Sequence, residues 1–252
     1  MNSTAHSCTS SSRTERWEAP PYSDTLRRMF MVSCSGFPIA VSRYLQEFMA
    51  VEVSDTELGI PGTGTLRRWQ REAPDGFLFT VLAPAEFGAS GFEKSGANDV
   101  ALKNILSFCK KLDALALVFR VPEEVSLNRT VKAQVTAMLS NLPAAAPQAV
   151  LDAPHWKPTH VAKICEATGA VAAADPLTLP EAPGDSPMAY LTLPGPAGHR
   201  SRYDEDSIEQ VAAVCRRSAA KKTICVFRNI DMEANAKSLI ELMEGEGGPE
   251  EE

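Results

Sequence analysis

Acidic residues recur in this 252-residue chain at the ends of short apolar segments, where carboxylates can act as acids, bases or metal ligands. They are Glu52, Asp55, Asp152, Asp175 and Asp231. Carboxylates that converge near an imidazole suit Mg²⁺, Mn²⁺ or Zn²⁺, so one hypothesis is a divalent metal bound near His155. The alternative is that these acids cap helices in the loops, or pair with Arg120 and Arg228.

His155 is the best candidate for a general base, because an imidazole titrates near neutral pH. Together with Glu52 and Asp152 it forms the predicted catalytic group. The adjacent Trp156 would give a ligand an apolar or stacking wall. The alternative is that His155 is a packed loop residue with no chemical role.

Cys34 ends the first apolar segment, which is where a barrel enzyme would place a nucleophile. A reactive thiolate needs a nearby cation or helix N-terminus, and the N–H groups of Ser35 and Gly36 could bind an anion. The alternative is a cysteine that is merely packed. The residues predicted to contact a ligand are Cys34, Ser35, Trp156, Asp175, Arg228 and Asn229.

Alternating secondary structure must bring these distant residues together. Short apolar runs predict strands at 30–34, 50–53, 77–82, 114–121, 148–152, 170–174, 187–193 and 223–227. Amphipathic spacing predicts helices at 41–49, 65–72, 99–112, 128–142, 159–167, 204–217 and 233–243. Asn128 is the expected N-cap of the fourth of these helices.

Eight strands alternating with at least seven helices predict a parallel sheet. The length and regular spacing favour a single-domain α/β fold, a (β/α)8 TIM barrel whose functional face is the carboxyl end of its strands. The other possibility is an open doubly wound sheet. That fold would favour a Gly-rich dinucleotide fingerprint after the first strand, and Cys-Ser-Gly-Phe-Pro at 34–38 is not one.

The two ends of the chain differ in composition from the part between them. Residues 1–25 are polar, Ser-rich and aperiodic, which predicts a disordered leader rather than a transit peptide. Residues 244–252 form an acidic Gly/Glu tail. The barrel domain is therefore expected at 26–243.

The overall charge bounds the possible partners. Asp and Glu total 32 against 25 Lys and Arg, a net charge of −7, and an acidic surface disfavours nucleic-acid binding. The basic cluster Arg67, Arg68 and Arg71 beside Trp69 is the one feature that favours it, although a solvated helix face is the simpler interpretation. The expected partner is a small molecule of unknown identity.

No apolar run reaches the roughly 18 residues of a membrane span, so no membrane association is predicted. The six cysteines include no CxxC pair, which is typical of a reducing compartment and predicts a cytoplasmic protein.

Motifs at the segment ends are similar, in order, to those of the YecE-like family, or domain of unknown function 72. They include Ser-Cys-Ser-Gly-Phe at 33–37, Val-Glu at 51–52, Thr-Leu-Arg-Arg-Trp at 65–69, Ala-Asp-Pro at 174–176, Tyr-Asp-Glu at 203–205 and Phe-Arg-Asn at 227–229. The resemblance spans about 32–242 and implies a TIM barrel of unknown function.

Several family positions at the predicted pocket have changed. Leu82 stands where the family has lysine, Ala153 and Thr192 where it has arginine, and Pro194 where it has histidine. The loss of these basic groups indicates an altered ligand specificity or a lost activity.

Three functions remain open at this point. The chain is interpreted first as a divergent YecE-like ligand-binding barrel with altered or lost catalysis. The alternatives are a metal-assisted hydrolase or isomerase of a phosphorylated or sugar-like substrate, and a non-enzymatic module that binds nucleic acid or protein. Whether the protein is an enzyme at all is left undecided.

Overall fold

The structure is a computed structural model that describes residues 29–179 and 182–245. The predicted leader at 1–25 and most of the predicted acidic tail at 244–252 lie outside the described residues. The strands are β1 (Met29–Ser35), β2 (Ala50–Val53), β3 (Leu78–Leu82), β4 (Ala116–Arg120), β5 (Gln148–Asp152), β6 (Val171–Ala174), β7 (Ala189–Leu193) and β8 (Lys222–Phe227).

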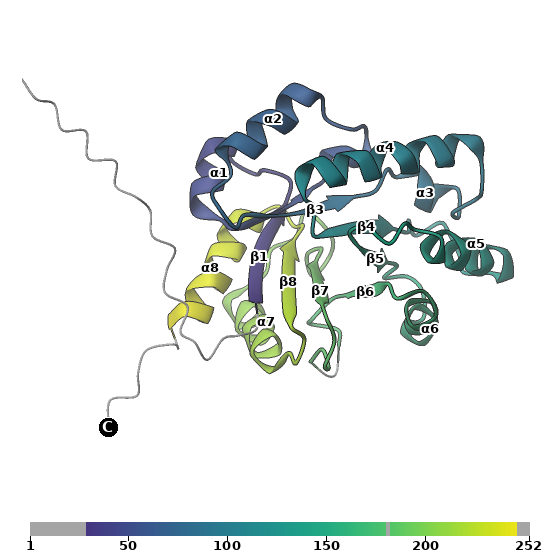
Figure 1. Ribbon diagram of the computed structural model, residues 1–252. Helices are drawn as coiled ribbons and strands as arrows, with labels where there is room; N and C mark the ends of the chain where they lie inside the picture. The colour runs from purple at the N-terminus through teal and green to yellow at the C-terminus, as the bar shows by residue number, and fades with distance from the viewer. Residues whose placement is uncertain (1–28, 180–181, 246–252) are drawn as a thin grey trace, which may run out of the picture.

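Helices alternate with most of the strands along the chain (Figure 1). They are α1 (Val41–Glu47), the 3-10 turn η1 (Asp55–Glu57), α2 (Thr63–Glu72), α3 (Glu86–Ala89), α4 (Gly96–Leu112), α5 (Arg129–Ser140), α6 (Pro158–Thr168), α7 (Glu205–Arg217) and α8 (Met232–Gly245).

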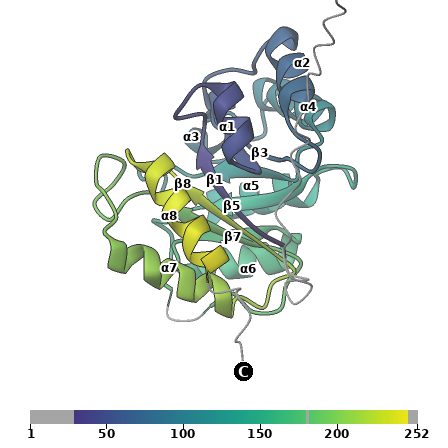
Figure 2. The ribbon, with the colours of Figure 1, turned by 90° about the vertical axis from the view of Figure 1, so that its left-hand side faces the viewer.

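The eight strands form one closed parallel barrel in the order β1 to β8, in which β8 pairs with β1. This confirms the predicted (β/α)8 TIM barrel, and the open doubly wound sheet is excluded. Because all strands are parallel, their carboxyl ends lie together at one end of the barrel, referred to below as the mouth. Figure 2 shows α7 and α8 side by side on the outside of the barrel, with α8 against β1 and β8.

The strands are mainly apolar because both faces of most of them are buried. Successive residues face opposite sides of the sheet. Leu82 and Val118 therefore belong to a cluster inside the barrel, whereas Val81 and Leu117 belong to a larger cluster between the barrel and its helices.

Side-chain caps start several helices where the chain leaves the mouth. Asn128 Oδ1 accepts a hydrogen bond from the Val131 backbone N–H at 2.9 Å, which confirms the predicted N-cap of α5. Ser95 and Asp204 cap α4 and α7 in the same way. Each cap satisfies one backbone donor that the first helical turn leaves unpaired.

The connection between β6 and β7 has no helix among its described residues, and amphipathic spacing predicted none there. All four residues of β6 are consequently only half-buried. A cavity of about 520 Å³ lies against this part of the barrel and is lined mainly by apolar residues, among them Ala172, Ala174 and Leu191. Within the described ranges, no helix is long and apolar enough to span a membrane.

Candidate functional site

A network of charged and hydroxyl side chains crosses the interior of the barrel at the mouth. Glu52 lies on β2, Asp152 ends β5, Tyr190 lies on β7 and Arg228 directly follows β8. Arg120 at the end of β4 and Glu57 in η1 extend the network to the surface. The mouth network is defined as Glu52, Glu57, Arg120, Asp152, Tyr190 and Arg228.

Arg228 is the centre of the mouth network. Its Nε donates to Glu52 Oε1 at 2.8 Å and its Nη2 donates to Glu52 Oε2 at 2.6 Å. Its Nη1 donates to Asp152 Oδ2 on the other side. The Arg228 side chain is only 8% exposed and Glu52 is fully buried, so one guanidinium links two carboxylates from opposite parts of the barrel.

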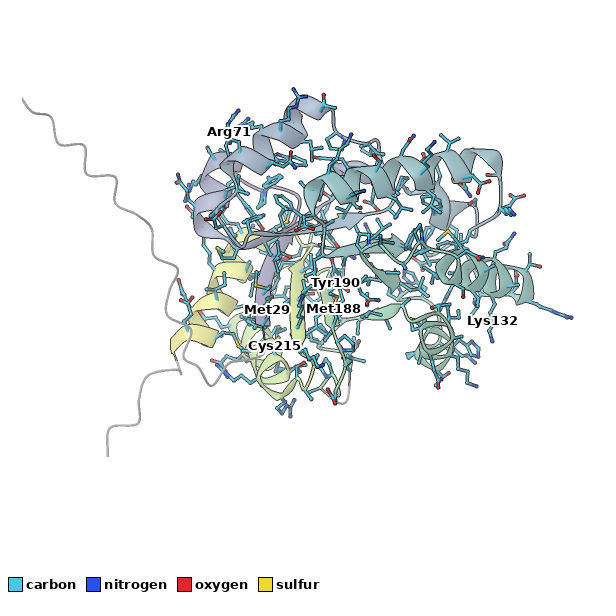
Figure 3. The ribbon with its side chains drawn as sticks, in the orientation of Figure 1. Met29, Arg71, Lys132, Met188, Tyr190 and Cys215 are labelled. Atoms are coloured by element: carbon cyan, nitrogen blue, oxygen red, sulfur yellow. The ribbon has the colours of Figure 1, made fainter. Side chains whose placement is uncertain are left out.

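A chain of hydroxyl groups supports Glu52 from within the barrel. The Tyr190 hydroxyl donates to Glu52 Oε2 at 2.8 Å. Since a phenol has a single proton to donate, the Thr80 hydroxyl, 3.0 Å from the Tyr190 oxygen, must be the donor in that contact. Figure 3 shows Tyr190 among the strands, close to Met188, which directly precedes β7.

Arg120 extends the ion pairs from the interior of the barrel to its surface. Its Nη1 lies 3.2 Å from Glu57 Oε1 and its Nε lies 3.6 Å from Asp152 Oδ2. Its side chain is 45% exposed. Both guanidinium groups of the mouth network are therefore paired with carboxylates of the same network.

These contacts set the ionisation of the site. Burial by itself raises the pKa of Glu52, but the charge of Arg228 and hydrogen bonds from Arg228, Ser35 and Tyr190 outweigh it, so the pKa of Glu52 is lowered. For Arg228, burial works to lower the pKa, yet the charges of Glu52 and Asp152 raise it well above its usual value. Glu52 is thus a stable carboxylate and a weak proton acceptor.

The same geometry does not fit a metal. The Arg228 guanidinium lies between Glu52 and Asp152, where a divalent cation would have to bind, and it engages both oxygens of Glu52. Among residues 29–179 and 182–245, no group of three or more His, Cys, Asp or Glu side chains is arranged to hold a metal ion. A guanidinium supplies the positive charge that the metal hypothesis assigned to an ion.

Two of the other predicted residues lie at or beside the mouth network. Ser35 donates a side-chain hydrogen bond to Glu52. Asn229 is fully buried, and its Nδ2 donates to Asn235 Oδ1 at 2.8 Å, which ties the end of β8 to α8. Asn229 Oδ1 is buried without a hydrogen-bond partner in the described part of the chain.

The remaining predicted residues do not join the mouth network. Cys34 faces the outer cluster beside Tyr44, and burial raises the pKa of its thiol to about 12. His155 is exposed, and the indole of Trp156 donates to the Val125 carbonyl at 2.8 Å. Asp175 Oδ1 accepts from the Leu177 N–H in a turn, and burial raises the pKa of Asp175. The structure therefore separates His155 from Glu52 and Asp152.

Sequence reasoning did not identify Tyr190, Thr80 or Glu57 as site residues. Tyr190 could have been predicted from the sequence, because a tyrosine inside an apolar strand needs a hydrogen-bond partner for its hydroxyl. The alternation of β7 also places Thr192 on the same face as Tyr190. Thr192 is buried and makes no side-chain hydrogen bond within the described residues.

The changed family positions fall on both sides of the sheet. Leu82 belongs to the cluster inside the barrel, and Thr192 shares the inward face of Tyr190. Ala153 belongs to the outer cluster and Pro194 is exposed. Only Leu82 and Thr192 therefore lie where a lost cation would have changed the interior of the mouth.

Proteins with the same fold are known from several sources. A DUF72 family protein from Enterococcus faecalis V583 has a TM-score of 0.69 at 13% identity, and the alignment covers 85% of this chain and 95% of that chain. One from Thermotoga maritima MSB8 has a TM-score of 0.65 at 16% identity, covering 86% and 99%. A xylose isomerase-like TIM barrel/4-hydroxyphenylpyruvate dioxygenase fusion protein has a TM-score of 0.59 at 12% identity, covering 88% and 45%. At such identities these likenesses show the fold alone.

No curated protein sequence matches the chain. The family model described as "Protein of unknown function DUF72" matches residues 25–251, which include every element of the barrel and the whole mouth network. This confirms the resemblance to the YecE-like proteins. The chain belongs to the DUF72 family, a family of TIM-barrel proteins of unknown function.

Proposed function

We propose that this protein binds a small polar molecule at the barrel mouth and does not catalyse a reaction there. The observation that carries the proposal is the position of Arg228, which is buried between Glu52 and Asp152 at the end of the barrel where TIM-barrel proteins bind their ligands. A buried ion pair is weak evidence for stability, since desolvation offsets most of its attraction. A binding role gives a reason to keep such a group.

Groups that remain available at the mouth support a binding role. Three N–H groups of Arg228 are directed at Glu52 and Asp152, and the other two have no acceptor among the described residues. The hydroxyl of Thr192 is also without a partner there. These donors are held by the barrel strands, so a ligand would meet a preorganised surface.

The state of the candidate groups supports a role without catalysis. Glu52 is held as a carboxylate by Arg228, which makes it a poor general base. His155 is exposed and outside the mouth network, and the thiol of Cys34 is buried on the other side of the sheet. The metal-assisted hydrolase or isomerase therefore has less support than a binding protein.

Nucleic-acid binding also has little support. Arg68 and Arg71 on α2 are paired with Glu72 at 3.0 Å and 3.2 Å, and Figure 3 shows Arg71 on the outer surface of that helix. A cytoplasmic location is part of the proposal and is supported by Cys34, Cys109, Cys165, Cys215 and Cys225, all of which are free thiols.

The proposal is tested by thermal shift with probes of three charge classes: D-glucose and D-fructose, their 6-phosphates, and D-glucosamine. At least one probe is expected to raise the melting temperature of the wild type and to lose this effect in Thr192→Val. The control is Thr136→Val, the same substitution on α5 away from the mouth, which should keep the effect. Absence of any shift, or a shift that survives Thr192→Val, contradicts binding at the mouth.

A further inference from the structure

We infer that the ligand of the mouth is an uncharged polyhydroxylated molecule, such as a sugar or polyol without a phosphate group. This inference rests on the proposed function, because it specifies the class of molecule that the same site binds. It is argued from the charge balance of the mouth network, and from the donors and acceptors that remain unused there.

The charges of the mouth network are already neutralised by one another. Arg228 is paired with Glu52 and Asp152, and Arg120 is paired with Glu57 and Asp152. Three carboxylates and two guanidinium groups leave an excess of one negative charge. An anion would have to displace a carboxylate from its guanidinium partner, and it would also meet net repulsion.

Nearby basic residues do not change this balance. Arg202, in the loop after β7, lies 3.0 Å from Asp231 and is paired with it. The ring of His199 is bonded through Nδ1 to the carbonyl of Arg228 at 2.6 Å, so it is held against the backbone. Arg200 is exposed on the same loop. None of them adds a buried positive charge to the interior of the mouth.

The unused groups form a donor next to an acceptor. One N–H on Nη1 and one on Nη2 of Arg228 have no acceptor in the described part of the chain. Asp152 receives its hydrogen bond and both of its ion pairs on Oδ2, and its Oδ1 accepts no hydrogen bond within the same residues. Because Arg228 Nη1 is bonded to Asp152 Oδ2, this free acceptor lies beside the free donors.

A hydroxyl group satisfies both the free donors and the free acceptor through a single oxygen atom. A hydroxyl donates one hydrogen bond and accepts others, so it can donate to Asp152 Oδ1 and accept from Arg228. A phosphate dianion has no proton for the carboxylate, and an ammonium has no lone pair for the guanidinium. The hydroxyl of Thr192 on β7 offers a further partner of the same kind. Several adjacent hydroxyl groups on one ligand would use all of these sites.

The test compares three matched probes by isothermal titration calorimetry: D-glucose, D-glucose 6-phosphate and D-glucosamine, with D-fructose and D-fructose 6-phosphate as a second scaffold. An uncharged sugar should bind at least about tenfold more tightly than its phosphate. The phosphate loses one charge-assisted hydrogen bond with the mouth network and is repelled by the excess negative charge there. Asp152→Asn puts an amide NH2 group in place of the free carboxylate oxygen. It should weaken binding of the uncharged sugar about tenfold. The wild-type comparison stands even if that variant fails to fold.

The outcomes separate the two proposals. A phosphate or an amino sugar that binds more tightly than the uncharged sugar, and depends on Thr192, overturns the ligand class while the mouth remains a binding site. Uncharged sugars that bind equally well to Thr192→Val and Asp152→Asn, or fail to bind at all, overturn the ligand class as well. If no probe of any charge binds, the proposed function fails with it.

Discussion

Arg228 determines what the other residues of the mouth can do. Because its guanidinium engages both oxygens of Glu52 and one of Asp152, Glu52 is not free to act as a base, and the space between the two carboxylates is not open to a metal. Replacing one partner leaves a buried charge without full compensation, and that cost is usually larger than the net stabilisation by the pair.

Glu52→Gln should therefore lower the free energy of unfolding by about 3 kcal/mol, because Arg228 keeps its charge and loses its principal counter-ion. Urea denaturation followed by circular dichroism measures this. The matched control is Glu72→Gln, which removes the partly exposed carboxylate that Arg68 and Arg71 contact on α2; it should change the midpoint little. Equal effects of the two substitutions would show that Arg228 does not depend on Glu52.

The stability of the protein should also depend on the ionisation of Glu52. Its pKa in the folded state is lowered from the ordinary value of 4.5, so its contribution is present above about pH 4.5 and is lost as the pH falls toward the folded-state pKa. Below pH 5 the unfolding free energy of the wild type should fall more steeply than that of Glu52→Gln. If the unfolding free energies of the two proteins fell equally steeply below pH 5, the lowered pKa of Glu52 would be contradicted.

At the scale of single residues, the sequence predicted part of the site. Glu52, Asp152 and Arg228 were recognisable because each lies at or near the carboxyl end of an apolar strand, and pairing of the acids with Arg228 was one of the alternatives. His155 was not separable from Asp152 by sequence, because three residues of loop can turn a side chain toward the mouth or away from it. Tyr190 was overlooked because its partners come from β2 and β3, far away in the chain.

At the scale of the elements, the barrel is least complete around β6. The described residues between β6 and β7 form no helix, so the outer face of β6 is only half-buried, and a cavity of about 520 Å³ lies beside it. Sequence periodicity located the strands because their apolar runs are continuous. The interval between β6 and β7 lacks amphipathic spacing, and none of the helices predicted from the sequence falls in it.

Ala172→Val should stabilise the protein by about 0.5–1 kcal/mol, because Ala172 lines this cavity and the added methyl groups fill empty space. Thermal unfolding measured by calorimetry tests this. Ala116→Val is the same substitution on a fully buried residue inside the barrel, and overpacking there should cost about 1–3 kcal/mol. A loss of stability in Ala172→Val comparable to that in Ala116→Val would show that the space beside β6 is already filled.

At the scale of the whole molecule, the closed barrel explains why distant residues form one network. Parallel strands place residues 52, 152 and 228 at the same end, although they are separated by most of the chain. Alternation of strands and helices was enough to predict this arrangement. The contacts across the barrel were not predictable in the same way, because they depend on side-chain rotamers and on which of several nearby charges pair.

The most direct test of the central claim is a high-resolution crystal structure of the protein after soaking with Mn²⁺. The expected result is an Arg228 guanidinium bonded to Glu52 and Asp152, with no anomalous peak between the two carboxylates, because the guanidinium holds the place a metal would need. An Arg228 side chain turned away from the mouth, with manganese bound by Glu52 and Asp152, would contradict the account and restore the metal-assisted alternative.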